Sequence, residues 1–145
     1  MVNRGSISQP YKKYAWKKQY ASIDQAPPTV NIWYPILDTT EDVKFIMLCI
    51  RHDNTGVTAE DIEVRCTVDD HIMVASATAL ASGTLYFIKI NYDADSLVCG
   101  TAIYLMAYYE SLEAQSGKVE IRQTSDVGAG ARLRAYLHYA TLEAT

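Results

Sequence analysis

Hydrophobic and polar residues alternate with a period of two along most of the chain after residue 28. The alternation is clearest in IEVRCTVD (residues 62–69), and it recurs in KVEIRQT (118–124) and ARLRAYLHYA (131–140). Because successive side chains of a strand point to opposite faces, this pattern predicts half-buried strands with one polar face. Further strands are expected over the denser apolar runs 43–52, 84–92 and 101–109, and over 30–37, where Pro35 indicates an edge strand or a bulge.

Turn-forming residues separate these runs. They occur at residues 53–56, 82–83, 93–95, 116–117 and 128–130. Strands divided in this way predict an all-β fold, an antiparallel β-sandwich or jelly roll of about seven or eight strands. Three short segments, residues 58–62, 77–82 and 110–115, could each hold a helical turn.

Charge divides the chain into two unequal parts. Residues 1–20 carry five of the 13 basic residues and none of the 17 acidic residues, so this segment is basic and the remainder is acidic. Such asymmetry is typical of a basic arm on an acidic body. We therefore expect an extended N-terminal arm over residues 1–28 and one β-sandwich domain over residues 29–145.

The arm combines lysines with aromatic rings. The candidate binding residues in it are Tyr11, Lys12, Lys13, Tyr14, Trp16, Lys17, Lys18 and Tyr20. Lysines and rings could contact phosphates and bases of a nucleic acid, but the arm has little arginine, and it lacks the broad leucine and phenylalanine face of a membrane-surface helix. Assembly is favoured, with aromatic anchors docking on a neighbouring subunit and lysines pairing with its acids. A solvated, disordered tail remains an alternative.

No catalytic, cofactor-binding or metal-binding motif stands out in the sequence. Histidine and carboxylate meet only at His52–Asp53 and at residues 69–71, where we expect the aspartates to cap turns and the histidines to face solvent. The polar face of the last predicted strand offers a possible interface, formed by Arg132, Arg134, Tyr136 and His138. Cys49, Cys66 and Cys99 lie in separate apolar runs, which predicts buried free thiols.

One resemblance rests on the strand patterns just described. The stretch NIWYPILDTTEDVKFIMLCIRHDNTGVTAEDIEVRCTVDD, followed by a glycine-bounded hairpin and LYFIKINY, resembles small β-sandwich virion proteins of tailed phages and related viruses, namely capsid decoration, head-fibre or minor capsid components. The likeness spans residues 30–142. It implies a non-enzymatic, self-assembling homo-oligomer with a terminal arm and no cofactor, associated with other virion proteins.

Two functions therefore follow from the sequence. The first is a virion structural protein, assembled in the host cytoplasm without a membrane, in which the sandwich and the arm form a symmetric oligomer or lattice. The alternative is a carbohydrate-binding, lectin-like or adhesin module, in which exposed tyrosine and tryptophan rings stack on sugars. The bias of 11 tyrosines against two phenylalanines fits either function, since tyrosine suits surfaces that are alternately wet and buried.

Overall fold

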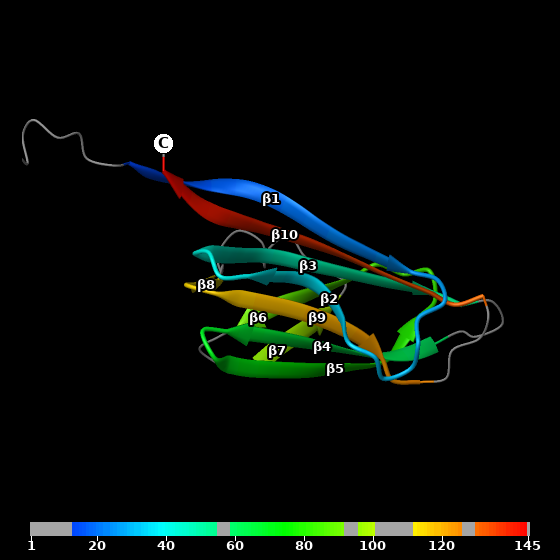
Figure 1. Ribbon diagram of the computed structural model, residues 1–145. Coiled ribbons are helices and arrows are strands. Elements are labelled where there is room, and N and C mark those ends of the chain that lie inside the picture. Colours follow the sequence, from blue (N-terminus) through cyan, green and yellow to red (C-terminus); the bar gives the residue numbers. More distant parts are fainter. Residues whose placement is uncertain (1–12, 55–58, 92–95, 101–111, 126–129, 145) are drawn as a thin grey trace, which may run out of the picture.

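Two antiparallel β-sheets form a sandwich in the computed structural model, which describes residues 13–54, 59–91, 96–100, 112–125 and 130–144 (Figure 1). The larger sheet has six strands in the order β1-β10-β3-β6-β7, with the short β8 paired to another part of β3. Its strands are β1 (Tyr14–Gln25), β10 (Arg132–Ala144), β3 (Val43–Asp53), β6 (Tyr86–Asn91), β7 (Ser96–Gly100) and β8 (Leu112–Ala114).

The smaller sheet has four strands in the order β2-β9-β4-β5. These strands are β2 (Tyr34–Thr39), β9 (Gly117–Gln123), β4 (Ala59–Val68) and β5 (His71–Ala81). The described residues include no helix long and apolar enough to cross a membrane.

The predicted all-β sandwich is confirmed, with some differences in detail. The described residues contain ten strands instead of seven or eight, because β1, β5, β7 and β8 were not predicted. The suggested helical turns are wrong where they can be compared, since residues 59–62, 77–81 and 112–114 all lie in strands. Pairing with a neighbouring strand outweighs the local helix preference of these short segments. The strand expected over residues 101–109 lies outside the described residues.

The core lies between the two sheets, where the apolar residues of each alternating pattern meet. Ile62, Val64, Cys66 and Val68 of β4 are at most 1% exposed, and Leu133, Ala135 and Leu137 of β10 face them from the other sheet. The core also takes in two partly buried residues of β1, Ala21 and Ile23. Period-two alternation therefore identified the buried face of both strands correctly.

His52 does not face solvent as expected, because its side chain is 1% exposed. It follows Leu48 and Ile50 at alternate positions of β3, so it shares their inward face. Its Nε2 atom donates a hydrogen bond to the carbonyl oxygen of Leu80, which satisfies one polar atom of the buried ring. Strand alternation outweighs the polarity of this side chain.

Among the aspartates that we expected to cap turns, Asp69 behaves as expected. Its Oδ1 atom accepts hydrogen bonds from the backbone nitrogens of Gln115 and Ser116, at 2.8 and 2.9 Å. His71 is exposed, also as expected. Asp53, however, pairs with arginines of its own sheet instead of capping a turn.

The predicted burial of free cysteines is confirmed for Cys49 and Cys66. Burial raises the pKa of Cys49 to about 11 and that of Cys66 to about 12. Both thiols are therefore protonated at neutral pH and behave as small apolar side chains. Cys99 belongs to β7, but its side chain lies outside the described part of the structure.

Residues 14–25, which we expected in the arm, form β1 at the edge of the larger sheet. β1 pairs antiparallel with β10 along its whole length, from Tyr14 opposite Ala144 to Gln25 opposite Leu133. Figure 1 shows β1 lying beside β10, at the margin of the sandwich. The alternation of β1 is hard to detect in the sequence because lysines occupy both of its faces.

Candidate functional site

The register between β1 and β10 brings the two predicted sets of interface residues onto one surface. Tyr20 lies opposite His138, Ser22 opposite Tyr136, and Asp24 opposite Arg134. Paired residues of antiparallel strands project to the same side of the sheet. We call this surface the outer face; it comprises Tyr14, Trp16, Lys18, Tyr20, Ser22 and Asp24 of β1, Arg132, Arg134, Tyr136 and His138 of β10, and Lys44, Met47, Cys49, Arg51 and Asp53 of β3.

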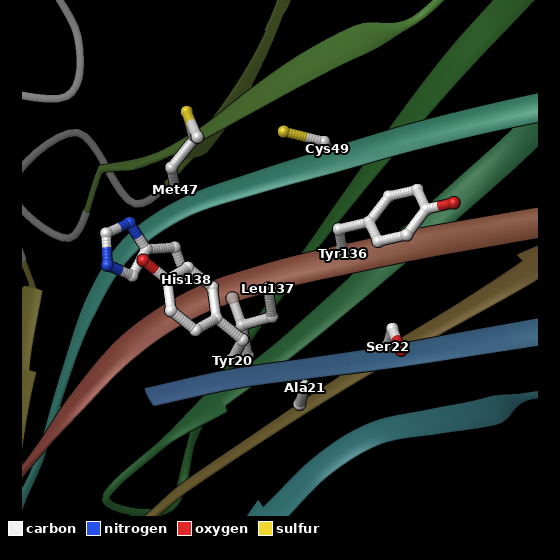
Figure 2. A pocket seen from close by; sticks show the side chains of 8 residues that line it. All are labelled: Tyr20, Ala21, Ser22, Met47, Cys49, Tyr136, Leu137 and His138. Carbon is white, nitrogen blue, oxygen red and sulfur yellow. The ribbon is translucent and has the colours of Figure 1, made fainter. Parts of the chain in front are cut away.

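An aromatic pocket occupies the middle of the outer face. The rings of Tyr20 and His138 stack with centroids 4.6 Å apart and planes inclined by 16°. Figure 2 shows Tyr136 beyond this stack on β10, and the sulfur atoms of Met47 and Cys49 on β3. The pocket has a volume of about 270 Å³, and Tyr20 and Tyr136 at its rim are 77% and 45% exposed. An apolar hollow between exposed rings can receive an aromatic or aliphatic group.

His138 is held in its neutral form within this pocket. Burial lowers the pKa of its imidazole below the usual 6.5, and the positive charge of Lys18 lowers it further. Its Nε2 atom is buried and has no hydrogen-bond partner among the described residues. The imidazole therefore acts mainly as a flat ring that supports Tyr20.

Protonation of His138 is expected to destabilise the fold in mildly acidic solution. The unfolded chain binds this proton near pH 6.5 and the folded chain only at lower pH, so the free energy of unfolding decreases as pH falls below about 6.5. Urea unfolding of wild type and of His138→Gln at pH 7.5 and 5.5 measures this effect. The decrease should be smaller in the variant, and equal decreases would contradict the prediction.

Ion pairs close one end of the outer face. Arg134 Nη2 lies 2.6 Å from Asp53 Oδ2, and Arg51 Nη2 lies 3.0 Å from Asp53 Oδ1. Burial raises the pKa of Asp53, but the hydrogen bonds and charges of both arginines outweigh burial and leave this pKa below its usual value. Both carboxylate oxygens of Asp53 thus accept hydrogen bonds, and the ion pair between Arg134 and Asp53 links β10 to β3.

Arg132 forms the corresponding link to β1. Its Nε atom lies 2.7 Å from Asp24 Oδ1, and its Nη2 atom contacts the other carboxylate oxygen. The hydrogen bond from Arg132 lowers the pKa of Asp24. The sequence left open whether Arg132 and Arg134 meet acids of a neighbouring strand or of a neighbouring subunit, and in this structure both meet acids of neighbouring strands.

The remaining predicted arm residues fall in different places. Trp16 lies on the outer face under Lys44, whose Nζ atom is 4.8 Å from the indole centroid, and Tyr14 beside it is 59% exposed. Lys17 points to the opposite side and lies 3.7 Å from Glu143. Lys13 is exposed, whereas Tyr11 and Lys12 lie outside the described residues.

Some residues of the outer face could not be predicted from the sequence. Met47 and Cys49 lie in a run that we expected to be covered on both faces, so they could not be assigned to the pocket. A β-bulge in β3 opposite His138 and Tyr139 shifts the alternation of β3 by one residue. Met47 keeps the regular alternation of Cys49 and Arg51, and the bulge beyond it turns Phe45 inward. No sequence signal marks this bulge.

A second charged surface lies on the smaller sheet and was also missed. The guanidinium carbons of Arg65 and Arg122 lie 4.3 and 4.4 Å from the ring centroid of Trp33. Arg65 donates two hydrogen bonds to the carboxylate of Glu120, from Nε at 2.9 Å and from Nη2 at 3.0 Å. In the part of the chain that is described, no three histidine, cysteine or acidic side chains are grouped so as to hold a metal ion.

Comparison with known proteins finds likeness at the level of structure, not of sequence. No family model matches the chain, and neither does any curated protein. Among solved structures, a chain described as "Acidic stable capsid structure of Helicobacter pylori bacteriophage KHP30" matches with a TM-score of 0.46 and 10% sequence identity. The match covers 93% of this chain and 98% of that chain.

Proposed function

We propose that this protein is a non-enzymatic virion structural protein that self-assembles through its β-sandwich and N-terminal residues into a symmetric oligomer or lattice. The virion setting comes from the resemblance of its strand patterns to small phage virion proteins. The observation that carries the assembly role is the convergence of Tyr14, Trp16 and Tyr20 with Tyr136 and His138 on one open surface.

The exposure of these rings supports a docking role. Tyr14, Tyr20 and Tyr136 are three of the seven large hydrophobic side chains that are exposed among the described residues, and all three lie on the outer face. Tyrosine and tryptophan are the usual hot spots of protein interfaces. A partner seated here would cover the pocket and gain most of its binding energy from these rings.

The charges of the outer face also suit a second copy of the chain. Lys18 and Lys44 project from the aromatic end, whereas the chain as a whole has a net charge of −4. Opposite charges on two copies would orient their encounter. The aromatic rings would then provide the affinity.

Alanine replacement of Tyr14, Trp16 and Tyr20 is expected to dissociate the oligomer without unfolding the sandwich. Truncating one buried anchor costs on the order of 2 kcal/mol, a loss of roughly 30-fold in affinity, so three together should abolish assembly. Light-scattering mass at matched concentrations measures this, with circular dichroism as the check on folding.

The matched control neutralises Lys12, Lys13, Lys17 and Lys18 instead. At physiological salt exposed charges are screened over about 8 Å, so this variant should keep most of its mass. Nucleic-acid binding would reverse the pattern. Salt-dependent retention of DNA or RNA that the lysine variant loses, with a mass indifferent to the alanine changes, would overturn the assembly proposal.

A carbohydrate-binding function is the second candidate. The observation that favours it is the pocket itself, with exposed Tyr20 and Tyr136 at its rim and Ser22 among its lining residues. Rings of this kind stack on the apolar faces of sugars. A glycan array screened with wild type and Tyr136→Ala tests it: binding by a monomeric wild type that the variant loses would favour this function over assembly.

A further inference from the structure

β1 is attached to the rest of the sandwich almost entirely through one neighbouring strand. It stands at the edge of the larger sheet and pairs only with β10 among the described strands. An edge strand with one neighbour can be replaced by the same strand of another copy without disturbing the rest of the sheet. Whether such an exchange is favourable depends on the contacts that each copy loses when its own β1 leaves.

The inward side of β1 contributes little to the hydrophobic core. Only Ala21 and Ile23 pack against the core, and both are partly exposed. The other positions on this side include Lys17, Gln19 and Gln25, which are polar. Removing β1 therefore uncovers far less apolar surface than removing an internal strand such as β3 would.

Most of the specific side-chain contacts of β1 are made with β10. Gln19 Nε2 donates to Thr141 Oγ1 at 2.6 Å, Tyr20 stacks on His138, and Lys17 lies 3.7 Å from Glu143. Asp24 of β1 and Arg132 of β10 also form an ion pair. All of these contacts can form equally well with β10 of a second copy, so exchange would cost none of them.

The connection from β1 to the smaller sheet is short. Asn31 is fixed there, because its backbone nitrogen donates to the carbonyl oxygen of Gln123 at 2.8 Å. Residues 26–30 therefore form the hinge, and this hinge contains the consecutive prolines Pro27 and Pro28. A short hinge invites strand exchange because it limits how β1 can fold back onto its own chain.

We propose that β1 exchanges between copies, so that β1 of one protomer pairs with β10 of its partner in the register seen here within one chain. This inference rests on the proposed self-assembly and names its partner surface, the β10 edge of a second copy. The exchange would carry Tyr14, Trp16 and Tyr20 onto the outer face of the partner.

A cysteine pair across the β1–β10 ladder tests the exchange in the full-length chain. Lys18 and Ala140 are directly opposite, and side chains in this relation are close enough for a disulfide once both are cysteine. Neither is one of the aromatic anchors, so the pair leaves the proposed assembly surface in place. Lys18→Cys/Ala140→Cys is purified under reducing conditions, oxidised at a concentration where wild type is oligomeric, and run on a non-reducing denaturing gel. We expect covalent dimers or larger species.

The controls separate this inference from the proposed function. Lys18→Cys and Ala140→Cys alone should give no covalent dimer, which excludes routes through the native cysteines or between two identical positions. An oligomeric protein whose double variant runs as an internally cross-linked monomer would overturn the exchange and leave assembly standing. A wild type that is monomeric at every concentration would overturn both.

Charge reversal gives a second, independent test that needs no disulfide. Asp24→Arg and Arg132→Asp each place like charges on paired strands, and mixing the two proteins restores opposite charges only if β1 changes chains. After unfolding and refolding together, the mixture should melt at a higher temperature than either variant alone. The same two changes in one chain should restore stability without mixing, and a mixture that melts as two separate variants would refute the exchange.

Discussion

The Gly117→Ala variant is expected to lose about 3 kcal/mol of unfolding free energy, at the upper end of the range for overpacked cores. A Cβ atom at this position would lie 2.9 Å from Phe45 Cε2, closer still to Phe45 Cζ, and 3.1 Å from Val43 Cγ1. Phe45 is 2% exposed and packed between the sheets, so its ring has no room to move away. Urea denaturation followed by circular dichroism measures the loss.

Two further variants identify the cause of this loss. Phe45→Leu shortens the opposing side chain, so Gly117→Ala should cost much less in that background than in wild type. Gly83→Ala is the matched glycine control, because Gly83 has a φ of +77° and its added Cβ would lie no closer than 3.6 Å to Asp53 Oδ1. Its cost should come from backbone strain and remain unchanged by Phe45→Leu; equal costs of Gly117→Ala in both backgrounds would contradict the clash.

The Arg65→Ala variant is expected to destabilise the fold by about 3 kcal/mol, because it leaves a buried carboxylate without its main partner. Glu120 is 5% exposed. Burial raises the pKa of Glu120, but the hydrogen bonds and charge of Arg65, with a smaller contribution from Lys118, outweigh burial and leave this pKa below 4.5. The variant also removes one of the two guanidiniums that cover Trp33.

The pH dependence of this effect has a definite sign. The folded-state pKa of Glu120 lies below its unfolded value, so its contribution is complete above about pH 4.5 and is lost as pH falls through the folded pKa. Wild type should therefore lose more stability than Arg65→Ala between pH 5 and 3. Lys17→Ala is the control, since its pair with Glu143 is exposed and its removal should change stability by no more than about 0.5 kcal/mol. Equal stabilities of wild type and Arg65→Ala at pH 7 would show that the buried pair is not needed.

The outer face consists partly of residues that the sequence identified, but the sequence did not predict how they are arranged. The sequence indicated one group of candidates near the N-terminus and another in the last strand, from their chemistry alone. Nothing in the sequence related Tyr20 to His138, which are 118 positions apart in the chain. Their stacking depends on the register of β1 against β10, and strand register over such separations is set by pairing and core packing rather than by local preference.

The sequence by itself determined the fold class and the buried faces of the regular strands. Alternation in β4, β9 and β10 is enough to decide which side chains turn inward, because strand geometry has a period of two and apolar residues avoid water. The same alternation places His52 inward, after Leu48 and Ile50, although the polarity of its side chain suggested that it would face solvent.

Only the tertiary structure decided that residues 14–25 belong to a sheet, that a bulge in β3 turns Phe45 inward, and that Arg132 and Arg134 meet Asp24 and Asp53. Each of these features depends on contacts between segments distant in sequence. A lysine-rich edge strand has no strong hydrophobic alternation of its own, and it becomes a strand because β10 offers it a ladder of backbone hydrogen-bonding groups.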